Sequence, residues 1–400
     1  MRPAILLTGA TGSLGRELLP RLLSRMPEAD MVLLLRARDG AAAAERLEEL
    51  RAYLRLYAPK APTRALAAVE GDVTRPRLGL DPARYAELAA RVTHIVHAAA
   101  DIGLGRELEH ARGVNVGGVR EVLAFAERCP RLEHLAHVST AYVAGTRAGA
   151  IREAELECGQ GFRNPYERSK CEAETWMRAR MSRLPITVFR PAILVGDSRD
   201  GHTCNFGNIY LPLKLTARGL LRDIPGRGGT RLDLVPTDYA AEVIARLTCR
   251  PSRRCCTYHV TAGSERAVRV RDLLEAVIAR FDRGGRRPLR FDEPESDGAG
   301  GAPRGDAPAP ARDAARQGTA PGNAVSARRA RRGAEPLAPF FSYLDGGQDF
   351  DDSTLRADLG AAGPRFPAPH EYLPRILDFC EETDWGRELP WKVQPCQPAA

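Results

Sequence analysis

A glycine-rich loop near the N-terminus constrains this chain more than any other feature of its sequence. The residues Thr-Gly-Ala-Thr-Gly-Ser-Leu-Gly begin at the end of an apolar run, Ala4–Thr8, and lead into an amphipathic stretch, Leu14–Arg25. A strand, a glycine loop and a helix in this order are typical of a dinucleotide-binding loop. Gly9 would permit the tight turn, Gly12 the approach of the backbone to a pyrophosphate, and Gly15 the packing of helix on strand. The helix N-terminus would then face the anion.

The rest of the first half alternates short apolar runs with longer amphipathic stretches, which predicts alternating strands and helices. The predicted strands are Ala4–Thr8, Met31–Leu35, Ala65–Val69, Thr93–His97, Leu132–Val138 and Ile186–Phe189. The predicted helices are Leu14–Arg25, Ala41–Tyr57, Glu107–Arg128 and Pro165–Arg183. Such alternation is typical of a parallel sheet with helices on both faces. We therefore expect an α/β fold: a Rossmann doubly wound parallel sheet with a smaller C-terminal substrate-binding part.

Beyond Gly196 the alternation loosens. Further predicted strands are Leu232–Val235, Tyr258–Thr261 and Leu289–Phe291, and further predicted helices are Tyr239–Leu247 and Val270–Phe281. We assign residues 1–292 to the dinucleotide-binding core, with substrate-binding insertions at about 197–235 and 259–292.

A change of composition marks the segment Glu293–Pro336. It consists mainly of Ala, Gly, Pro, Arg and Asp, and its one large apolar residue is Val325. Such a segment buries too little apolar surface to offset its ordering entropy, so residues 293–336 are predicted to be a disordered linker. Apolar residues then return, and we expect residues 337–400 to complete the substrate-binding part.

The overall composition narrows the function classes. With 59 basic and 51 acidic residues, the net charge of +8 is mild for 400 residues, and no nucleic-acid-binding module or basic stripe is present. The nine cysteines show neither C-x-x-C spacing nor zinc spacing, which favours a reduced cytoplasmic protein without a metal. No apolar run is long enough to span a membrane, and the apolar stretch at the N-terminus is too short for a signal peptide.

The end of the second predicted strand bears on the choice of cofactor. Folds that bind NAD commonly carry Asp or Glu there, which accepts a hydrogen bond from the ribose 2′-hydroxyl. Here Arg36 follows the strand, and a guanidinium suits a 2′-phosphate, so NADPH is favoured unless Arg36 merely reflects the arginine-rich composition. After the third predicted strand, Asp72 would reach the adenine amine or else occupy a surface turn.

A tyrosine and a lysine four residues apart, Tyr166 and Lys170, share one face of a predicted helix. Reduction of a carbonyl needs a proton donor, and a phenol with a pKa of about 10 is a poor acid–base catalyst at neutral pH. Lys170 would lower that pKa and hold the nicotinamide ribose, and Thr140 would donate to the carbonyl oxygen. A surface pair is the alternative, but the dinucleotide loop upstream argues against it.

These segments together resemble an extended short-chain dehydrogenase/reductase over about residues 3–292. The segments that carry the resemblance are Gly9–Gly15, His97–Ala100, Asn115, Thr140, Tyr166-x-x-x-Lys170 and Arg190-Pro191. Finer motifs resemble thioester reductases and the related fatty acyl-CoA reductases of male-sterility type. Those motifs are Leu35–Ala37, Ala44–Leu47, Gly71-Asp72, Pro76–Leu80, Val138–Val143, Gly196–Ser198 and Val235–Tyr239.

The resemblance implies a set of cofactor-binding residues as well as the catalytic residues Thr140, Tyr166 and Lys170. The cofactor-binding residues are Gly9, Thr11, Gly12, Ser13, Leu14, Gly15, Arg36, Arg46, Asp72, Val73, Ala98, Ala99, Ala100, Asn115, Lys170, Arg190 and Pro191. The motif after His97 departs from thioester reductases, because Asp101–Arg106 lacks the Asn and the Pro-Tyr pair that they usually carry.

We therefore predict an NADPH-dependent reductase of acyl thioesters carried on coenzyme A or on an acyl carrier protein, giving an aldehyde or an alcohol. With no adenylation or carrier segment in the sequence, it would be a stand-alone enzyme, and it could form a homodimer. Arg218, Arg222, Arg227 and Arg231 would together meet the phosphates of coenzyme A or an acidic carrier protein. The alternatives are an extended short-chain oxidoreductase or epimerase acting on a sugar nucleotide or hydroxysteroid, and a non-catalytic dinucleotide sensor.

Overall fold

The computed structural model describes most of the chain. The described residues are 2–37, 42–62, 66–249, 255–282, 288–291, 337–344 and 346–392. The predicted linker, Glu293–Pro336, lies outside the described residues.

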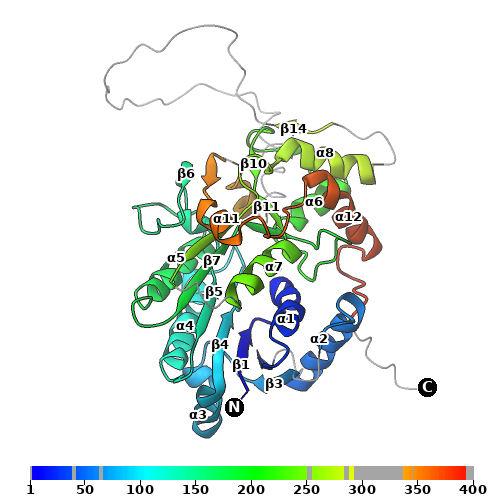
Figure 1. The fold of residues 1–400 in the computed structure, drawn as a ribbon. Coiled ribbons are helices and arrows are strands. Elements are labelled where there is room, and N and C mark those ends of the chain that lie inside the picture. Colours follow the sequence, from blue (N-terminus) through cyan, green and yellow to red (C-terminus); the bar gives the residue numbers. More distant parts are fainter. Residues whose placement is uncertain are drawn as a thin grey trace, which may run out of the picture.

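A seven-stranded sheet forms the centre of the molecule (Figure 1). Its strands are β1 Ala4–Thr8, β2 Asp30–Leu35, β3 Leu66–Glu70, β4 Val92–His97, β5 His134–Val138, β7 Ile186–Pro191 and β12 Thr257–Val260. Their order is β12-β7-β5-β4-β1-β2-β3, and every neighbouring pair is parallel. The predicted doubly wound α/β fold is confirmed, and the order of the sheet reverses between β1 and β4.

Helices cover both faces of this sheet (Figure 1). On one face lie α1 Ser13–Arg25, α2 Ala43–Tyr57 and α7 Thr237–Thr248; on the other lie α3 Pro82–Arg91, α4 Leu108–Ala126 and α5 Pro165–Arg178. Alternate residues of a strand point to opposite faces. In β1, Ile5 and Leu7 accordingly join one apolar core, and Ala4 and Leu6 join the other. The near-continuous apolar strands of the sequence arise because the sheet is buried on both sides.

The 3₁₀ turn η2 Pro76–Gly79 packs with α3 and α4, because Leu78 joins their apolar core and the Arg77 backbone donates to the Glu121 carboxylate.

The other elements build the smaller part above the carboxyl ends of the strands (Figure 1). They are the 3₁₀ turn η3 Ala141–Ala144, the strands β6 Gly149–Ile151, β8 Ile193–Val195, β9 Asp223–Ile224, β10 Arg231–Leu232, β11 Leu234–Pro236, β13 Val268–Arg269, β14 Arg290–Phe291 and β15 Gln348–Phe350, and the helices α6 Tyr210–Ala217, α8 Val270–Phe281, α10 Ala338–Phe341, α11 Ser353–Leu359 and α12 Pro369–Glu382. The C-terminal residues rejoin the fold, since β15 pairs with β6.

One predicted strand, Leu232–Val235, is wrong as a single element. Asp233 separates β10, which pairs antiparallel with β13, from β11, which pairs parallel with β8. The Asp233 carboxylate accepts hydrogen bonds from the backbone N–H groups of Ala262 and Gly263, at 2.8 and 3.2 Å. These bonds hold the chain at the point where it passes from one small sheet to the other.

Two further observations hold for the described residues. None of their helices has both the length and the apolar composition needed to cross a membrane. None of their eight cysteines takes part in a disulfide.

Candidate active site

A cavity of about 450 Å³ lies at the carboxyl ends of the strands. In doubly wound sheets, ligands bind in the crevice where the strand order reverses, which here is between β1 and β4. The structure brings many of the predicted site residues together in its lining. Those residues are Gly9, Thr11, Gly12, Ser13, Leu14, Gly15, Ala98, Ala100, Thr140, Tyr166, Lys170 and Pro191.

The glycine loop has the geometry that its sequence predicts. Gly9 has a φ of +75°, and a Cβ there would stand 2.6 Å from the carbonyl carbon of Ala98. A Cβ on Gly15 would stand 2.1 Å from the carbonyl oxygen of Gly9. Both positions therefore exclude side chains for reasons internal to the fold.

Gly12 differs from the other two glycines, because a Cβ there would meet its nearest neighbour, the carbonyl oxygen of Gly9, only at 3.4 Å. It lines the cavity and is the N-cap of α1, where no side chain caps the first turn. The N–H groups of a helix's first turn have no intrahelical acceptor and attract anions. The loop thus fits a dinucleotide pyrophosphate.

Beside the loop, polar side chains converge at the end of β2. Arg46, on α2, donates to the Thr11 hydroxyl and to the backbone carbonyl of Arg36, both at 2.7 Å. The Arg36 side chain is 46% exposed, and its guanidinium lies 4.0 Å from the Asp72 carboxylate. The other carboxylate oxygen of Asp72 accepts from the backbone and hydroxyl of Thr74, so Asp72 stabilises its own turn.

The catalytic candidates lie around the N-terminus of α5. Asn164 caps this helix, because its side-chain oxygen accepts from the Glu167 backbone at 3.0 Å, and Pro165 occupies the first helical position. This arrangement orients Tyr166 toward the cavity. Lys170, one turn later, is buried and donates from Nζ to the carbonyl oxygen of Val138 at 2.7 Å.

Burial shifts the pKa values of both Tyr166 and Lys170. Burial raises the pKa of Tyr166 to about 12, although a hydrogen bond with Thr140 opposes the shift. That Lys170 lowers the pKa of this phenol remains a prediction, since burial is the largest influence on it in the protein alone. Burial also lowers the pKa of Lys170 to about 8, against the attraction of the Glu174 carboxylate. Both groups are protonated at pH 7, as a proton donor to a developing oxyanion must be.

Two histidines lie buried near Lys170 and remain neutral. His97 and His137 are paired in register on β4 and β5, and their rings stack with centroids 5.4 Å apart. Burial lowers the pKa of His97 to about 3 and that of His137 well below its usual range, and the charge of Lys170 adds to both shifts. Lys170 thus carries the positive charge on this side of the cavity.

Some predicted cofactor residues do not line the cavity. Arg190 is buried elsewhere, where its guanidinium binds the Glu174 carboxylate at 2.7 Å and the backbone carbonyl of Glu155 at 2.7 Å. Asn115 donates to the Ser169 hydroxyl at 2.9 Å and accepts from the Asp101 backbone at 2.8 Å. Both side chains therefore brace the elements around the site. Val73 and Ala99 are likewise absent from the lining.

A second set of lining residues was not singled out by the sequence analysis, although most of them lie in the segments 197–235 and 337–400 that it predicted to bind substrate. They come from the loop after β4, from residues 203–210 and from the C-terminal segment: Ile102, Leu104, Thr203, Cys204, Asn205, Gly207, Asn208, Ile209, Tyr210, Phe340 and Tyr343. Phe340 and Tyr343 follow the predicted linker and share no spacing pattern with the rest of the site. An apolar return after residue 336 was the only signal, and it does not indicate which side chains reach the cavity.

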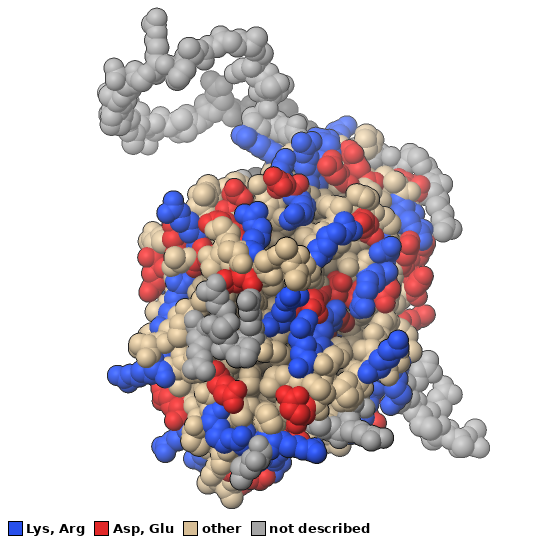
Figure 2. Space-filling view, viewed as in Figure 1, with Lys and Arg blue, Asp and Glu red and all other residues tan. Residues whose placement is uncertain are grey.

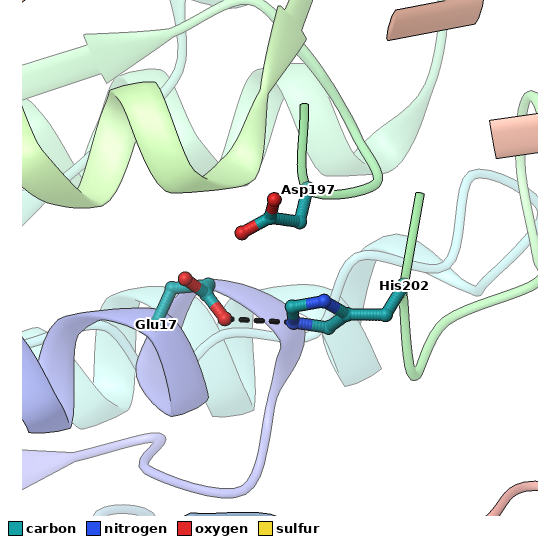
Figure 3. Close-up of side chains that lie close together, drawn as sticks. All are labelled: Glu17, Asp197 and His202. Atoms are coloured by element: carbon teal, nitrogen blue, oxygen red, sulfur yellow. Dashed lines mark hydrogen bonds and ion pairs between the residues drawn. The ribbon is translucent and has the colours of Figure 1, made fainter. Parts of the chain in front are cut away.

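A buried ionic cluster joins the loop region near the cavity to α1 (Figure 3). Glu17, Asp197 and His202 point toward one another, and His202 Nε2 lies 2.9 Å from Glu17 Oε1. His202 Nδ1 lies 2.5 Å from the Asp200 carboxylate. Burial alone would lower the pKa of His202, but its bonds to Asp200 and Glu17 raise it to about 9.

Each member of this cluster is thus already satisfied by a partner within the protein. Both ring nitrogens of His202 face carboxylates, while Glu17 pairs with Arg21 at 2.5 Å and Asp197 pairs with Arg199 at 2.6 Å. We interpret the cluster as an ion-pair network that fixes residues 197–203 against α1, rather than as a set of metal ligands.

Of the four arginines that were expected to meet a phosphate, Arg218, Arg227 and Arg231 are exposed, whereas Arg222 is not available. Arg222 is only 8% exposed and lies 3.4 Å from the Asp282 carboxylate, so its charge is used inside the fold. Arg218 lies 3.6 Å from Asp384. Acidic and basic side chains are mixed over the face drawn in Figure 2, which therefore shows no single basic field.

Comparison with known proteins identifies relatives of this site. The family model described as male sterility protein, an NAD-binding domain, matches residues 7–244. The isonitrile lipopeptide synthase of Streptomyces coeruleorubidus is 31% identical over 262 residues, which cover 64% of this chain and 17% of that protein. The fatty acyl-CoA reductase wat of Drosophila melanogaster is 26% identical over 273 residues, which cover 60% of this chain and 53% of that protein.

A solved structure extends the similarity to the C-terminal part. The terminal R domain of the myxalamid PKS-NRPS biosynthetic pathway superposes with a TM-score of 0.74 at 26% identity, covering 95% of this chain and 91% of that one. The chain spans about a sixth and about half of the two curated relatives above, so their full activities exceed what the shared region accounts for.

Proposed function

Because the chain belongs to the male sterility protein family of NAD-binding domains, we propose that it is an NADPH-dependent reductase of acyl thioesters. The observation that carries the proposal is the single cavity that joins the glycine loop to Thr140, Tyr166 and Lys170. The proposed substrates are acyl groups on coenzyme A, as in the name of the Drosophila relative, or on a carrier protein.

The bound nicotinamide cofactor would supply the hydride in this proposal. Thr140 and Tyr166 would donate hydrogen bonds to the thioester carbonyl oxygen as negative charge develops there. Tyr166 would transfer its proton to that oxygen, giving a hemithioacetal. Lys170, held by the Val138 carbonyl, would keep a positive charge beside the phenolate left behind.

The second half of the reaction breaks the carbon–sulfur bond. The hemithioacetal returns its hydroxyl proton to the Tyr166 phenolate, the carbonyl re-forms, and the thiolate leaves and takes a proton from solvent. The products are one aldehyde and one free thiol for each hydride consumed. Reduction of the aldehyde to an alcohol would repeat the first half at the same three residues.

The choice of NADPH over NADH rests on the arginines at the end of β2. Arg36 is half exposed, and Arg46 is bonded to Thr11 in the glycine loop, so both would flank a phosphate on the adenosine ribose. The carboxylate that a ribose 2′-hydroxyl would favour is replaced by Arg36 at the end of this strand.

Arg36→Asp should weaken NADPH binding much more than NADH binding. Loss of a charge-assisted phosphate bond costs about 1.5–3 kcal/mol. Titration of each cofactor into the wild type and the variant measures the effect, and Arg55→Asp, an exposed charge reversal at the last turn of α2, is the control. Equal affinities of the wild type for the two cofactors would contradict the assignment.

Activity should also depend on the charge of Lys170. Its pKa of about 8 lies below the usual value, so the ammonium is present below pH 8 and is lost above it. Tyr166, with a pKa of about 12, stays protonated throughout. We therefore expect kcat/KM to be level below about pH 8 and to fall about tenfold per pH unit above it. A profile that stays level to pH 10 would show that this charge is not needed.

The proposed activity is tested by following NADPH oxidation and free thiol together. Purified protein is offered acyl-coenzyme A and acyl-pantetheine thioesters, with sugar nucleotides and ketosteroids in parallel. One thiol should appear with each first hydride consumed. The oxidoreductase alternative would replace the proposal if no thioester released thiol while the protein oxidised NADPH with a ketosteroid as substrate or turned over a sugar nucleotide. Binding of NADPH with no turnover of any substrate would favour the sensor.

A further inference from the structure

The lining of the cavity has two parts of different chemistry. One part is the glycine loop at the N-terminus of α1. The other comes from the C-terminal segment through Phe340 and Tyr343, and it lies on the side of Tyr166, because Tyr343 bonds to Asn164, the cap of the helix that carries Tyr166. Because hydride and proton must meet at the carbonyl beside Tyr166, the acyl group of a substrate would point toward this second part.

Tyr343 is held rigidly in that wall. Its hydroxyl oxygen accepts a hydrogen bond from the Asn164 side chain at 2.9 Å, and Asn164 is the cap of the helix that carries Tyr166. Its ring stands edge-on to Tyr142, with centroids 4.9 Å apart, and the Arg163 guanidinium lies 5.3 Å from its centroid. The position of the wall is therefore tied to the catalytic helix.

Phe340 lies about one helical turn before Tyr343 and presents only carbon to the cavity. Its side chain is 9% exposed, and the buried residues Leu337 and Leu344 anchor the segment on either side of it. The Thr230 hydroxyl also donates to the Leu344 carbonyl at 2.7 Å. An apolar ring on an anchored segment lines this part of the cavity without offering a hydrogen bond to a substrate.

The space left for an acyl group is small. The cavity of about 450 Å³ must hold the nicotinamide half of the cofactor as well as the reacting end of the substrate. We therefore expect an extended acyl chain that leaves the carbonyl away from the glycine loop to meet the aromatic wall.

We propose that Phe340 determines the length of the acyl group, and that the chain reduces thioesters of short or compact apolar acids in preference to long-chain fatty acyl thioesters. This inference rests on the proposed reductase activity and adds its specificity. Tyr343 positions the wall, whereas Phe340 fills the space that a longer chain would need.

The test compares wild type with Phe340→Ala on a series from butyryl- to palmitoyl-coenzyme A, measuring kcat/KM by thiol release. Each methylene that gains apolar space favours binding by about fourfold, so the ratio of kcat/KM for lauroyl over butyryl should rise about tenfold or more in the variant. The rise should appear mainly as a lower KM for the long substrate, since the added contacts do not involve the reacting atoms. Phe340→Trp should shift the ratio the other way.

Phe366→Ala is the matched control. Phe366 is a buried phenylalanine of the same C-terminal part, packs on Tyr239 with ring centroids 4.7 Å apart and does not line the cavity. Its truncation should lower the melting temperature without altering the chain-length ratio. Affinity for NADPH should be unchanged in Phe340→Ala, because the glycine loop, Arg36 and Lys170 are all left intact.

The outcomes separate this inference from the proposed function. Thiol release by the wild type, with the same chain-length ratio in wild type, Phe340→Ala and Phe340→Trp, overturns the inference and leaves the reductase activity standing. A wild type that prefers palmitoyl- over butyryl-coenzyme A also overturns it. No thiol from any thioester overturns both. If Phe340→Ala does not fold, Phe340→Leu and Phe340→Trp still test the direction of the shift.

Discussion

Replacing Tyr166 by phenylalanine is expected to lower kcat by about 100-fold or more, because the change removes the proton donor and little else. The phenol lines the cavity, and burial keeps it protonated with a pKa of about 12. Affinity for NADPH should remain nearly unchanged, since Lys170 and the glycine loop are intact. Single-turnover NADPH oxidation measures the chemical step, and fluorescence titration measures cofactor binding.

The matched control is Tyr85→Phe. Tyr85 lies on α3, where its ring packs against Phe125 with centroids 5.1 Å apart, and it does not line the active-site cavity. Loss of its hydroxyl should leave kcat within about twofold of the wild type. If Tyr166→Phe retained near-normal turnover, another group would have to supply the proton, and the assignment of the trio would be wrong.

The second large effect is expected from the glycine loop, where one glycine-to-alanine substitution should reduce stability and another should reduce cofactor affinity. Gly15→Ala places a methyl group 2.1 Å from the Gly9 carbonyl oxygen and 2.8 Å from Ala10 Cα. Both are backbone atoms, so no side-chain rotation can relieve the clash. We expect a loss of about 3 kcal/mol in the free energy of unfolding, at the upper end of what overpacking costs. Chemical denaturation measures this loss.

Gly12→Ala is the comparison. Its methyl group would meet nothing closer than 3.4 Å, so the free energy of unfolding should change by less than about 1 kcal/mol. Because Gly12 lines the cavity at the expected pyrophosphate position, the added methyl group should hinder the approach of the cofactor, and NADPH affinity should fall about tenfold or more. The prediction is refuted if Gly12→Ala unfolds as readily as Gly15→Ala, or if it binds NADPH as tightly as the wild type.

The sequence by itself determined the features whose cause is local. The glycine loop, the Tyr166–Lys170 spacing and the alternation of strand and helix each lie within one or two consecutive elements, where backbone geometry dictates the pattern. A parallel sheet then brings the carboxyl ends of its strands to one edge. That rule is enough to place the loop, Thr140, Tyr166 and Lys170 around one cavity, although they span more than 150 residues of chain.

Only the tertiary structure decided which side chains surround that cavity and which are buried in interactions elsewhere in the protein. Tyr343 reaches Asn164 across 179 residues, and His202 reaches Glu17 across 185, through contacts that no periodicity records. The same applies to Arg190 and Arg222: as residue types they suit a phosphate, but their burial against Glu174 and Asp282 uses their charge inside the protein. The raised pKa of Tyr166 has a similar origin, since burial of the phenol depends on the packing of the whole site and is not encoded in a local motif.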